Sequence, residues 1–403
     1  MRILELHVQG FRSLKDVTWK PGKLNVLIGP NGTGKSNLLR LLELLSVSAQ
    51  GRLGRHIQAA GGMEPLVWDG ASREITIAVK TSPIIPGRSE ERDALTYSIS
   101  LARLGESSSY KISHELLGNY YRMDRGERPE PFKFLEREGM VAHVFDNAGN
   151  GLMVPQESLS EEESLLSIAS GPFSYNQYIP PYQRELAGWS LYHDLHVNQG
   201  AAIRQPAVAR MEKRVSPDGQ NLINVLHTLY TGDRDFKKEI DLAMRAAFGD
   251  DFEELVFPPA ADQRIQLRMR WKSLRREQSA SDLSDGTLRF LALLAVFASP
   301  SAAPIIAVDE PETGLHPSML PIVAEYAVEA SRRAQVIMTT HSPALLDAFD
   351  EDDLPQATIA SWEGGQTILR TIRGNVLDQW LENYSMGELM SSSELERLAE
   401  MEA

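Results

Sequence analysis

The residues best suited to chemistry stand near the start of the chain, in a glycine-rich loop. Residues 29–36 read Gly-Pro-Asn-Gly-Thr-Gly-Lys-Ser and match the pattern G-x-x-x-x-G-K-[ST] in full. The glycines let backbone N–H groups face a phosphate, and the start of the following helix adds partial positive charge. Lys35 would reach the β- and γ-phosphates of a nucleotide, and the Ser36 hydroxyl would hold Mg²⁺. A chance glycine turn is the alternative, but the complete pattern between a strand and a helix argues against it.

Two acids follow an apolar segment near the other end of the chain. Residues 305–308 predict a buried strand, and Asp309 and Glu310 come directly after it. A carboxylate at the end of a strand beside a phosphate loop can hold Mg²⁺ through water, and we assign this role to Asp309. Side chains alternate along a strand, so we expect Glu310 to point the other way and act as a general base on water. The alternative is a turn with two solvated acids.

Two further segments carry residue types that suit phosphate. His341 follows the next predicted strand, where it could contact a γ-phosphate and sense its loss. The alternative for His341 is a position next to a helix cap. Ser284 and Gly286 open the helix that precedes the acid strand, and a helix N-terminus is a natural site for an anion.

The order of these motifs resembles that of the ABC-type ATPases. Within them the chain resembles the SMC, RecF and OLD-like branch, and most of all the small stand-alone bacterial "predicted ATPases" without a Toprim nuclease domain. The marks of that branch lie at 11–14 (Phe-Arg-Ser-Leu), 29–37, 309–312 (Asp-Glu-Pro-Glu) and 314–317 (Gly-Leu-His-Pro). The resemblance covers nearly the whole chain and is weaker from about 80 to 215.

The resemblance implies ATP and Mg²⁺ as cofactors and a head-to-tail dimer formed on ATP. Each site would take its phosphate loop and acids from one subunit, and Ser284 and Gly286 from the other. Glu310, His341 and Lys35 would act in catalysis, and Ser36 and Asp309 would hold the metal. The nucleotide would be bound by Arg12, Asn31, Gly32, Thr33, Gly34, Lys35, Ser36, Asn37, Ser284 and Gly286.

The chain departs from the family pattern at the signature segment. Asp285 stands where the family's L-S-G-G-Q has its first glycine, and Thr287 stands where it has glutamine. This variant is usual in the RecF and OLD-like subset that the chain resembles. An acid near a γ-phosphate could slow turnover. The glutamine of the family's Q-loop is ambiguous here, with Gln50 and Gln58 as weak candidates.

Hydrophobic periodicity places these motifs in an α/β fold. Strands and helices alternate at both ends of the chain, which predicts a parallel sheet, whereas 73–145 predicts antiparallel strands. We therefore expect a P-loop NTPase ABC-type head with an antiparallel β subdomain and a helical subdomain. The expected segments are an N-terminal lobe at 1–145, an irregular and helical insertion at 146–263, and a C-terminal lobe at 264–403.

Composition limits the class of protein. The 403 residues are 42% hydrophobic and 24% charged, as in ordinary globular proteins, and carry a formal net charge of −14. No cysteine is present, which excludes disulfides and thiolate metal sites. The apolar run Leu291–Ala298 is far short of the ~20 residues of a membrane-spanning helix. No signal peptide is evident either, and the expected location is the cytoplasm.

One stretch is basic in this acidic chain. Six basic residues and no acid lie within 264–276, and the alternation over 264–272 predicts one strand with a basic face. This face is either a solvated surface or a binding site for DNA or an acidic partner. The residues expected to contact DNA are Arg264, Arg268, Arg270 and Lys272.

Two classes of function are therefore open. The first is an ATPase that couples its cycle to DNA or to a separately encoded effector, with DNA repair and phage defence as the candidate processes. The second is a nucleotide-gated scaffold with little turnover that binds a partner protein. An ABC transporter motor is disfavoured, and the 62 residues after His341 suggest no nuclease of its own. His193 and His196 could suggest metal ligands, but without a third histidine we interpret them as part of a packed loop.

Overall fold

The computed structural model describes residues 1–105, 108–119, 132–147, 149–170, 176–372, 377, 380–381 and 383–401. Contacts among them divide the chain into two compact units. Unit 1 comprises Met1–Gly22, Ile28–Trp189 and Thr358–Thr371, and unit 2 comprises Lys23–Leu27, Ser190–Ala357 and Ile372–Ala403. These units differ from the three consecutive segments expected from the sequence, because the chain enters each unit more than once.

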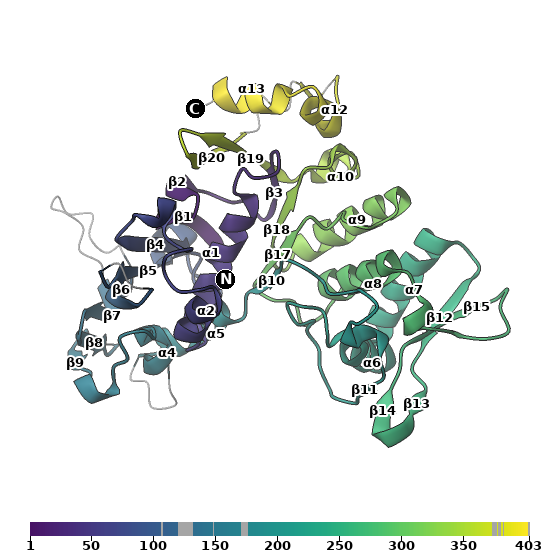
Figure 1. The fold of residues 1–403 in the computed structure, drawn as a ribbon, viewed down its shortest axis with the longest axis horizontal. Helices are drawn as coiled ribbons and strands as arrows, with labels where there is room; N and C mark the ends of the chain where they lie inside the picture. The colour runs from purple at the N-terminus through teal and green to yellow at the C-terminus, as the bar shows by residue number, and fades with distance from the viewer. Residues whose placement is uncertain are drawn as a thin grey trace. The chain divides into compact units, whose positions relative to one another are not determined.

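An antiparallel sheet forms most of unit 1 (Figure 1). Its eight strands follow the order β2-β1-β4-β5-β6-β7-β8-β9, with antiparallel pairing at each step. The predicted alternation is confirmed, since Ile75, Ile77 and Val79 are fully buried and the residues between them are more exposed. The strands are β1 Ile3–Phe11, β2 Leu14–Trp19, β4 Glu74–Thr81, β5 Leu95–Arg103, β6 Tyr110–Asn119, β7 Phe132–Glu138, β8 Val141–Phe145 and β9 Gly151–Met153.

Helix α1 is the central helix of unit 1. It spans Lys35–Ala49, and Leu38, Leu39, Leu41 and Leu42 are fully buried because α4 and α5 pack against it. The other helices of this unit are α2 Leu53–Ala59, η1 Trp68–Gly70, α3 Glu90–Asp93, η3 Gln156–Ser158, α4 Leu165–Ala169 and α5 Ile179–Ala187.

A six-stranded sheet carries the segments that hold the motifs. Its order is β10-β17-β18-β3-β19-β20, and β10, β17 and β18 pair in parallel. All five residues of β3 are buried, as expected for a central strand covered on both faces. The strands are β3 Leu24–Ile28, β10 Ser190–Tyr192, β17 Ile305–Asp309, β18 Gln335–Thr340, β19 Gln356–Glu363 and β20 Gln366–Thr371.

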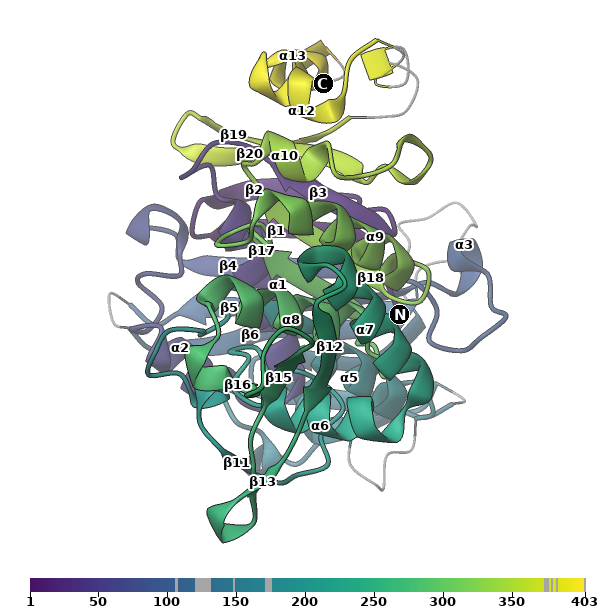
Figure 2. The ribbon, with the colours of Figure 1, turned by 90° about the vertical axis from the view of Figure 1, so that its right-hand side faces the viewer.

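Helices cover the parallel strands of unit 2. Helix α8 is buried along most of its length, and α9 lies beside it (Figures 1 and 2). The helices are η4 Ala202–Arg204, α6 Leu222–Gly232, α7 Arg234–Phe248, η5 Ala261–Gln263, η6 Ala280–Asp282, α8 Asp285–Phe297, η7 Pro317–Met319, α9 Leu320–Ser331, α10 Pro343–Leu346, η8 Glu351–Asp353, α12 Met386–Ser391 and α13 Glu394–Met401. Among the described residues, no helix combines the length and apolarity that a membrane crossing requires.

The basic stretch at 264–272 is not one strand, and the expectation of a single basic face is wrong. Arg264–Ile265 form β14, in a sheet of order β11-β14-β13. Arg268–Trp271 form β15, in a separate sheet of order β12-β15-β16. The remaining short strands are β11 Ala207–Val208, β12 Phe252–Val256, β13 Pro259–Ala260 and β16 Gln278–Ser279.

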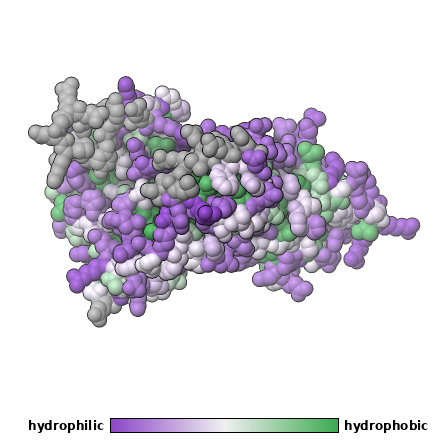
Figure 3. Space-filling model, turned by 90° about the horizontal axis from the view of Figure 1, so that it is seen from above, coloured by the Kyte–Doolittle hydropathy of each residue, from purple (hydrophilic) through white to green (hydrophobic). Residues whose placement is uncertain are grey.

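The surface drawn in Figure 3 is mixed in character. Green hydrophobic residues lie singly or in small groups among purple hydrophilic ones. This distribution is usual for a protein surface and singles out no large apolar patch among the residues coloured there.

Candidate functional site

The phosphate loop leaves strand β3 and enters helix α1 through Gly34. This residue has a φ of 96°, a left-handed conformation that costs little for glycine alone. A Cβ at this position would overlap Thr367 Oγ1 and lie 2.5 Å from Ser13 Oγ. Both the backbone and the space around it therefore require glycine at this point of the motif.

Lys35 lies against the loop that it is expected to serve. It is 5% exposed, and its Nζ donates to the carbonyl groups of Gly29 at 2.6 Å and Pro30 at 3.0 Å. Gly32 faces open space, since a Cβ there would meet nothing within 4 Å. One ammonium group and the N–H groups at the start of a 15-residue helix form a donor set that fits a polyphosphate. Ser36 is half-buried, and Asn31 and Gly32 are exposed on this loop.

Arg12 provides a second donor in unit 1. Its backbone is left-handed, with a φ of 47°, and its N–H donates to Leu66 O at 2.7 Å. Burial, followed by the nearby Arg40, lowers the pKa of Arg12. Its Nε is buried and has no hydrogen-bond partner within the described part of the chain. A cation with an unsatisfied donor suits an anionic ligand.

Other polar side chains hold the loop in shape. Asn37 Nδ2 donates to Ser13 Oγ at 2.8 Å, so this amide, expected to bind nucleotide, here supports the loop. Thr367 Oγ1 lies 2.7 Å from Ser13 Oγ and 2.8 Å from Thr33 O. Sequence reasoning missed Thr367 because 354 positions separate it from Ser13 and no local pattern marks it.

In unit 2, Asp309 is fixed at the end of strand β17. It pairs in register with Thr339 of β18, whose Oγ1 donates to Asp309 Oδ1. His193 Nδ1 lies 3.9 Å from Asp309 Oδ2, so this histidine lies next to the acid and not with His196, which is near Asp194. An ionised carboxylate held by a threonine is a suitable oxygen ligand for Mg²⁺.

Glu310 does not continue the strand, so the alternation argument for its direction fails. Strand β17 ends at Asp309, and Glu310 has a φ of 46°. Its N–H donates to Thr339 O at 3.2 Å and to Thr339 Oγ1 at 3.1 Å, which holds this conformation. A left-handed non-glycine residue costs about 1–2 kcal/mol, and such strain is common at active sites.

His341 and Glu310 form a pair. His341 Nδ1 lies 3.0 Å from Glu310 Oε1. An ionised carboxylate can only accept, so the Nδ1 of His341 carries the proton in this pair. Both side chains are partly exposed, at 44% for His341 and 33% for Glu310, so water can reach them. The structure thus brings together the two residues that the sequence expected to act on a γ-phosphate.

Glu312 is a further acid at this end of the sheet. Its Oε1 accepts from Thr340 Oγ1, and its Oε2 has no hydrogen-bond partner in the described ranges. Burial raises the pKa of Glu312, although Thr340 and His341 act in the other direction. Sequence reasoning recorded Glu312 only as part of the family pattern and missed the role of Thr340.

Replacing Glu312 by glutamine should change how stability depends on pH. A carboxyl whose pKa is raised in the folded state stabilises at low pH, and this contribution is lost as pH rises above the unfolded value of about 4.3. Glutamine does not ionise, so the melting temperature of Glu312→Gln should improve relative to wild type between about pH 4 and pH 8. Exposed Glu325→Gln on α9 is the control. A melting-temperature difference for Glu312→Gln that does not change with pH would contradict this assignment.

The signature segment forms the N-terminus of helix α8. Ser284 is the N-cap, and its Oγ accepts from Thr287 N at 3.1 Å. A Cβ on Gly286 would lie 2.5 Å from Gly314 O, so this glycine allows close contact with the segment that follows the acids. Within unit 2, the signature therefore packs against the loop after Glu310.

Two other side chains near the motifs make local hydrogen bonds. His316 accepts from Ser318 N at 3.3 Å and caps η7, and Gln50 Nε2 donates to Ala187 O at 2.8 Å. Among the described residues, no group of three or more histidine or acidic side chains is arranged to hold a metal ion.

A family comparison matches this arrangement of motifs. A family model described as "AAA domain, putative AbiEii toxin, Type IV TA system" matches residues 24–347, a range that contains the phosphate loop, the signature, the acids and His341. The chain belongs to this family. No match was found among curated proteins.

Solved structures show the fold of this AAA-domain protein. It is similar to an SMC head bound to the C-winged helix domain of ScpA, with a TM-score of 0.53, 14% identity, and coverage of 94% of this chain and 100% of that one. A Pyrococcus furiosus Smc head bound to the C-terminal domain of ScpA gives a TM-score of 0.51, 14% identity, and coverage of 94% and 98%. The fold is therefore that of a P-loop NTPase with an ABC-type head.

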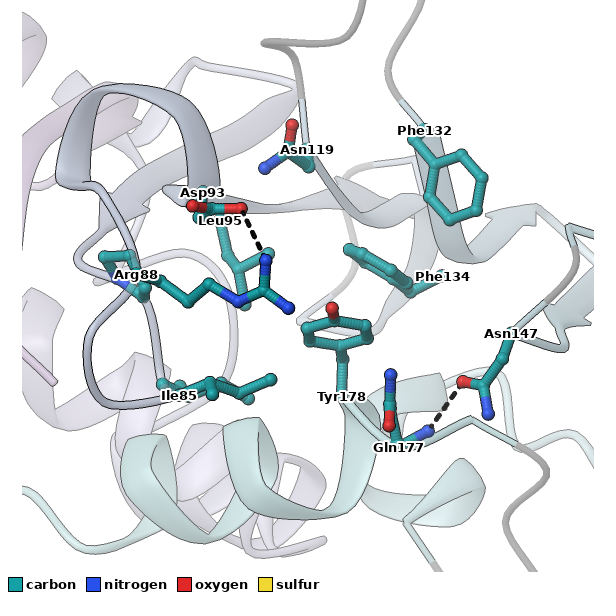
Figure 4. A pocket seen from close by; sticks show the side chains of 12 residues that line it. Ile85, Arg88, Asp93, Leu95, Asn119, Phe132, Phe134, Asn147, Gln177 and Tyr178 are labelled. Carbon is teal, nitrogen blue, oxygen red and sulfur yellow. Dashed lines mark hydrogen bonds and ion pairs between the residues drawn. The ribbon is translucent and has the colours of Figure 1, made fainter.

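A separate pocket of about 180 Å³ lies in unit 1 of the AAA-domain protein (Figure 4). Phe134 stacks near Tyr178, with ring centroids 4.7 Å apart, and Arg88 lies beside them. Its polar groups contact one another: Arg88 lies 3.9 Å from Asp93, and Asn147 Oδ1 accepts from the N–H of Gln177. The pocket contains none of the expected site residues, and we assign it no role in nucleotide chemistry.

Proposed function

We propose that the chain binds and hydrolyses ATP as a molecular switch that dimerises head-to-tail on ATP. The observation that carries this proposal is the pairing of Glu310 with His341 beside Asp309, in a chain that also has a complete phosphate loop. Family membership supports the proposal too, because AAA domains bind nucleotide. We also propose that the chain belongs to the RecF and OLD-like branch and that it is located in the cytoplasm.

The phosphate loop and the acids would serve the same nucleotide. Lys35 and the loop N–H groups hold the phosphates, and Ser36 and Asp309 provide oxygen ligands for Mg²⁺. Bound Mg²⁺ neutralises charge on the phosphates during transfer. Thr339 keeps Asp309 in one orientation by donating to its Oδ1.

Glu310 is the proposed general base. Its carboxylate accepts a proton from the attacking water, while the contact with His341 Nδ1 holds the carboxylate in place. The left-handed backbone at Glu310 moves its side chain off the line of the strand, and the two bonds to Thr339 fix this geometry. The base is thus positioned before water and nucleotide arrive.

Ser284 and Gly286 would complete the site of the opposite subunit. Their helix N-terminus presents a hydroxyl and backbone N–H groups, which suit a γ-phosphate. The contact of Gly286 with Gly314 links this surface to the loop after Glu310, so the state of one site can affect the other.

Mixing two inactive variants tests the shared site. Lys35→Ala lacks the phosphate-loop cation but keeps its signature, and Ser284→Arg puts a bulky cation into the signature but keeps its phosphate loop. Each alone should hydrolyse almost no ATP, while Ser284→Arg still binds it. Their mixture should regain part of the wild-type rate, because the mixed dimer contains one complete site. A mixture no more active than its components, beside an active wild type, would contradict the shared site.

The alternative is a nucleotide-gated scaffold with little turnover. It would bind ATP and dimerise but release phosphate very slowly, with a partner protein reading the closed state. The turnover number of the wild type, with and without duplex DNA, distinguishes the two functions. The solved SMC heads contain a bound ScpA domain, and a separately encoded effector is the corresponding partner that we propose here. The family description names a toxin of type IV systems, and we propose phage defence or DNA repair as the process.

DNA is a second candidate partner. The residues that we propose for it differ from those expected from the sequence. Arg270 Nη2 lies 2.8 Å from Glu277 Oε1 and Arg268 Nη1 lies 3.5 Å from Glu277 Oε2, so acids outside the basic stretch neutralise these two arginines. The loop that follows, with Lys272, Arg275 and Arg276, is exposed. This loop is the feature that favours DNA.

Reversing the charge of the loop tests this candidate. The triple variant of Lys272, Arg275 and Arg276 to glutamate should weaken binding of short duplex DNA, and its salt slope should fall by about 0.9 per lost phosphate contact. Arg268→Gln with Arg270→Gln is the matched control and should keep the slope. Anisotropy at two salt concentrations measures both. Equal binding by wild type and the triple variant would exclude this loop as the DNA site.

A further inference from the structure

A buried arginine lies behind the signature segment. Arg204 ends the short helix η4, and its side chain is only 3% exposed. A buried cation is costly unless hydrogen bonds and an opposite charge compensate for its lost hydration. The contacts of Arg204 therefore show what it is placed to hold.

The guanidinium of Arg204 hydrogen-bonds to the turn that leads into helix α8. Its Nη2 forms an ion pair with Asp285 Oδ1, and Asp285 is the first residue of that helix. Its other N–H groups donate to backbone carbonyls, namely Val197 O at 2.8 Å, Asn198 O at 3.1 Å, Ala280 O at 3.2 Å, Ser281 O at 3.4 Å and Leu283 O at 2.7 Å. Asp285 is the one full negative charge among these contacts in the described chain.

Asp285 stands where the L-S-G-G-Q signature of the ABC-type ATPases has its first glycine. An aspartate beside Ser284, at a helix N-terminus that must accept a γ-phosphate, would repel that phosphate if its charge stood alone. The carbonyl oxygens of the preceding turn also carry partial negative charge, and Arg204 binds three of them.

We infer that Arg204 is a positioning residue that neutralises Asp285 and thereby lets this signature segment bind the ATP phosphate of a partner subunit. This inference rests on the proposed function, since it concerns the signature of the shared site. Arg204 is needed for dimerisation on ATP because Asp285 is present. A chain with a neutral residue at 285 would not need it for charge.

A charge-rescue experiment tests this requirement. The variants Arg204→Gln, Asp285→Asn and the double variant are made in the Glu310→Gln background, which is expected to retain ATP. Sedimentation velocity gives the dimer dissociation constant with ATP and Mg²⁺, a fluorescent ATP analogue gives monomer affinity, and melting temperature reports folding. Arg214→Gln is the matched control, because Arg214 also donates to backbone carbonyls in unit 2, at Ser301 and Ala302.

The expected result is a loss in one variant and a recovery in the double variant. Arg204→Gln should weaken the ATP dimer about ten-fold or more, because the bare Asp285 charge then faces phosphate, while monomer affinity for ATP stays unchanged. Adding Asp285→Asn should restore the dimer to within about three-fold of the parent. Arg204→Lys keeps the charge with fewer donors and should lie between the parent and Arg204→Gln, which keeps the test available if Arg204→Gln folds poorly.

The outcomes separate this inference from the proposed function. A parent that dimerises, with Arg204→Gln and the double variant equally weak, would make Arg204 merely structural and overturn the inference. A parent that dimerises with no change in Arg204→Gln or Arg204→Lys would also overturn it. A parent that binds ATP but does not dimerise would overturn the shared-site proposal itself.

Discussion

Lys35→Ala should abolish ATP binding at ordinary nucleotide concentrations. Lys35 is the only cation of the loop, and it is 5% exposed, so its loss removes a charge from a nearly dry position. Losing one partner of a buried charged contact costs about 3–5 kcal/mol, which corresponds to an affinity loss of roughly 10²- to 10⁴-fold. Titration of a fluorescent ATP analogue measures the effect.

Lys23→Ala is the matched control for this loss. Lys23 lies just before strand β3 and is exposed, so its removal tests for a general effect of charge on this segment. The control should bind ATP as the wild type does, and the melting temperatures should show that both variants fold. If Lys35→Ala bound ATP with wild-type affinity, the proposal that the phosphate loop binds ATP through Lys35 would be wrong.

Glu310→Gln should bind ATP but hydrolyse it about 10²- to 10⁴-fold more slowly. The substitution removes the proposed base and leaves Lys35, Ser36 and Asp309, the groups proposed to hold the phosphates and the metal, unchanged. The glutamine can still contact His341 Nδ1, so the geometry of the cluster should survive. Single-turnover assays with labelled ATP measure the chemical step apart from product release.

Exposed Glu325→Gln on helix α9 provides the control for loss of an acid in unit 2. It should hydrolyse ATP at the wild-type rate. If Glu310→Gln also kept that rate, the assignment of the base would be wrong, and another group would have to accept the proton from water.

The phosphate loop and the acid strand could be predicted because their chemistry lies in contiguous residues. Gly34, Lys35 and Ser36 are consecutive at the start of helix α1, and the apolar strand β17 ends at Asp309. Helices α1, α6, α7, α8 and α9 and the antiparallel strands followed from periodicity, which records the face that each element buries. Helices α4 and α5 did not, because the segment that contains them was expected to be irregular.

The contacts that support the site could not be predicted, because they join distant positions. Thr367 meets Ser13 across 354 positions, and Arg204 meets Asp285 across 81. Two inferences from strand periodicity failed for a related reason. The basic stretch divides between two sheets, and Glu310 leaves the strand with a positive φ, so alternation applies to neither.

The dimer on ATP is the central claim, and sedimentation velocity of Glu310→Gln tests it most directly. The variant is run without nucleotide, with ADP and Mg²⁺, and with ATP and Mg²⁺. The account predicts a species of twice the 44.9 kDa chain mass with ATP, which the other two conditions do not give. The same sedimentation coefficient in all three conditions, in a sample shown to bind ATP, would contradict it.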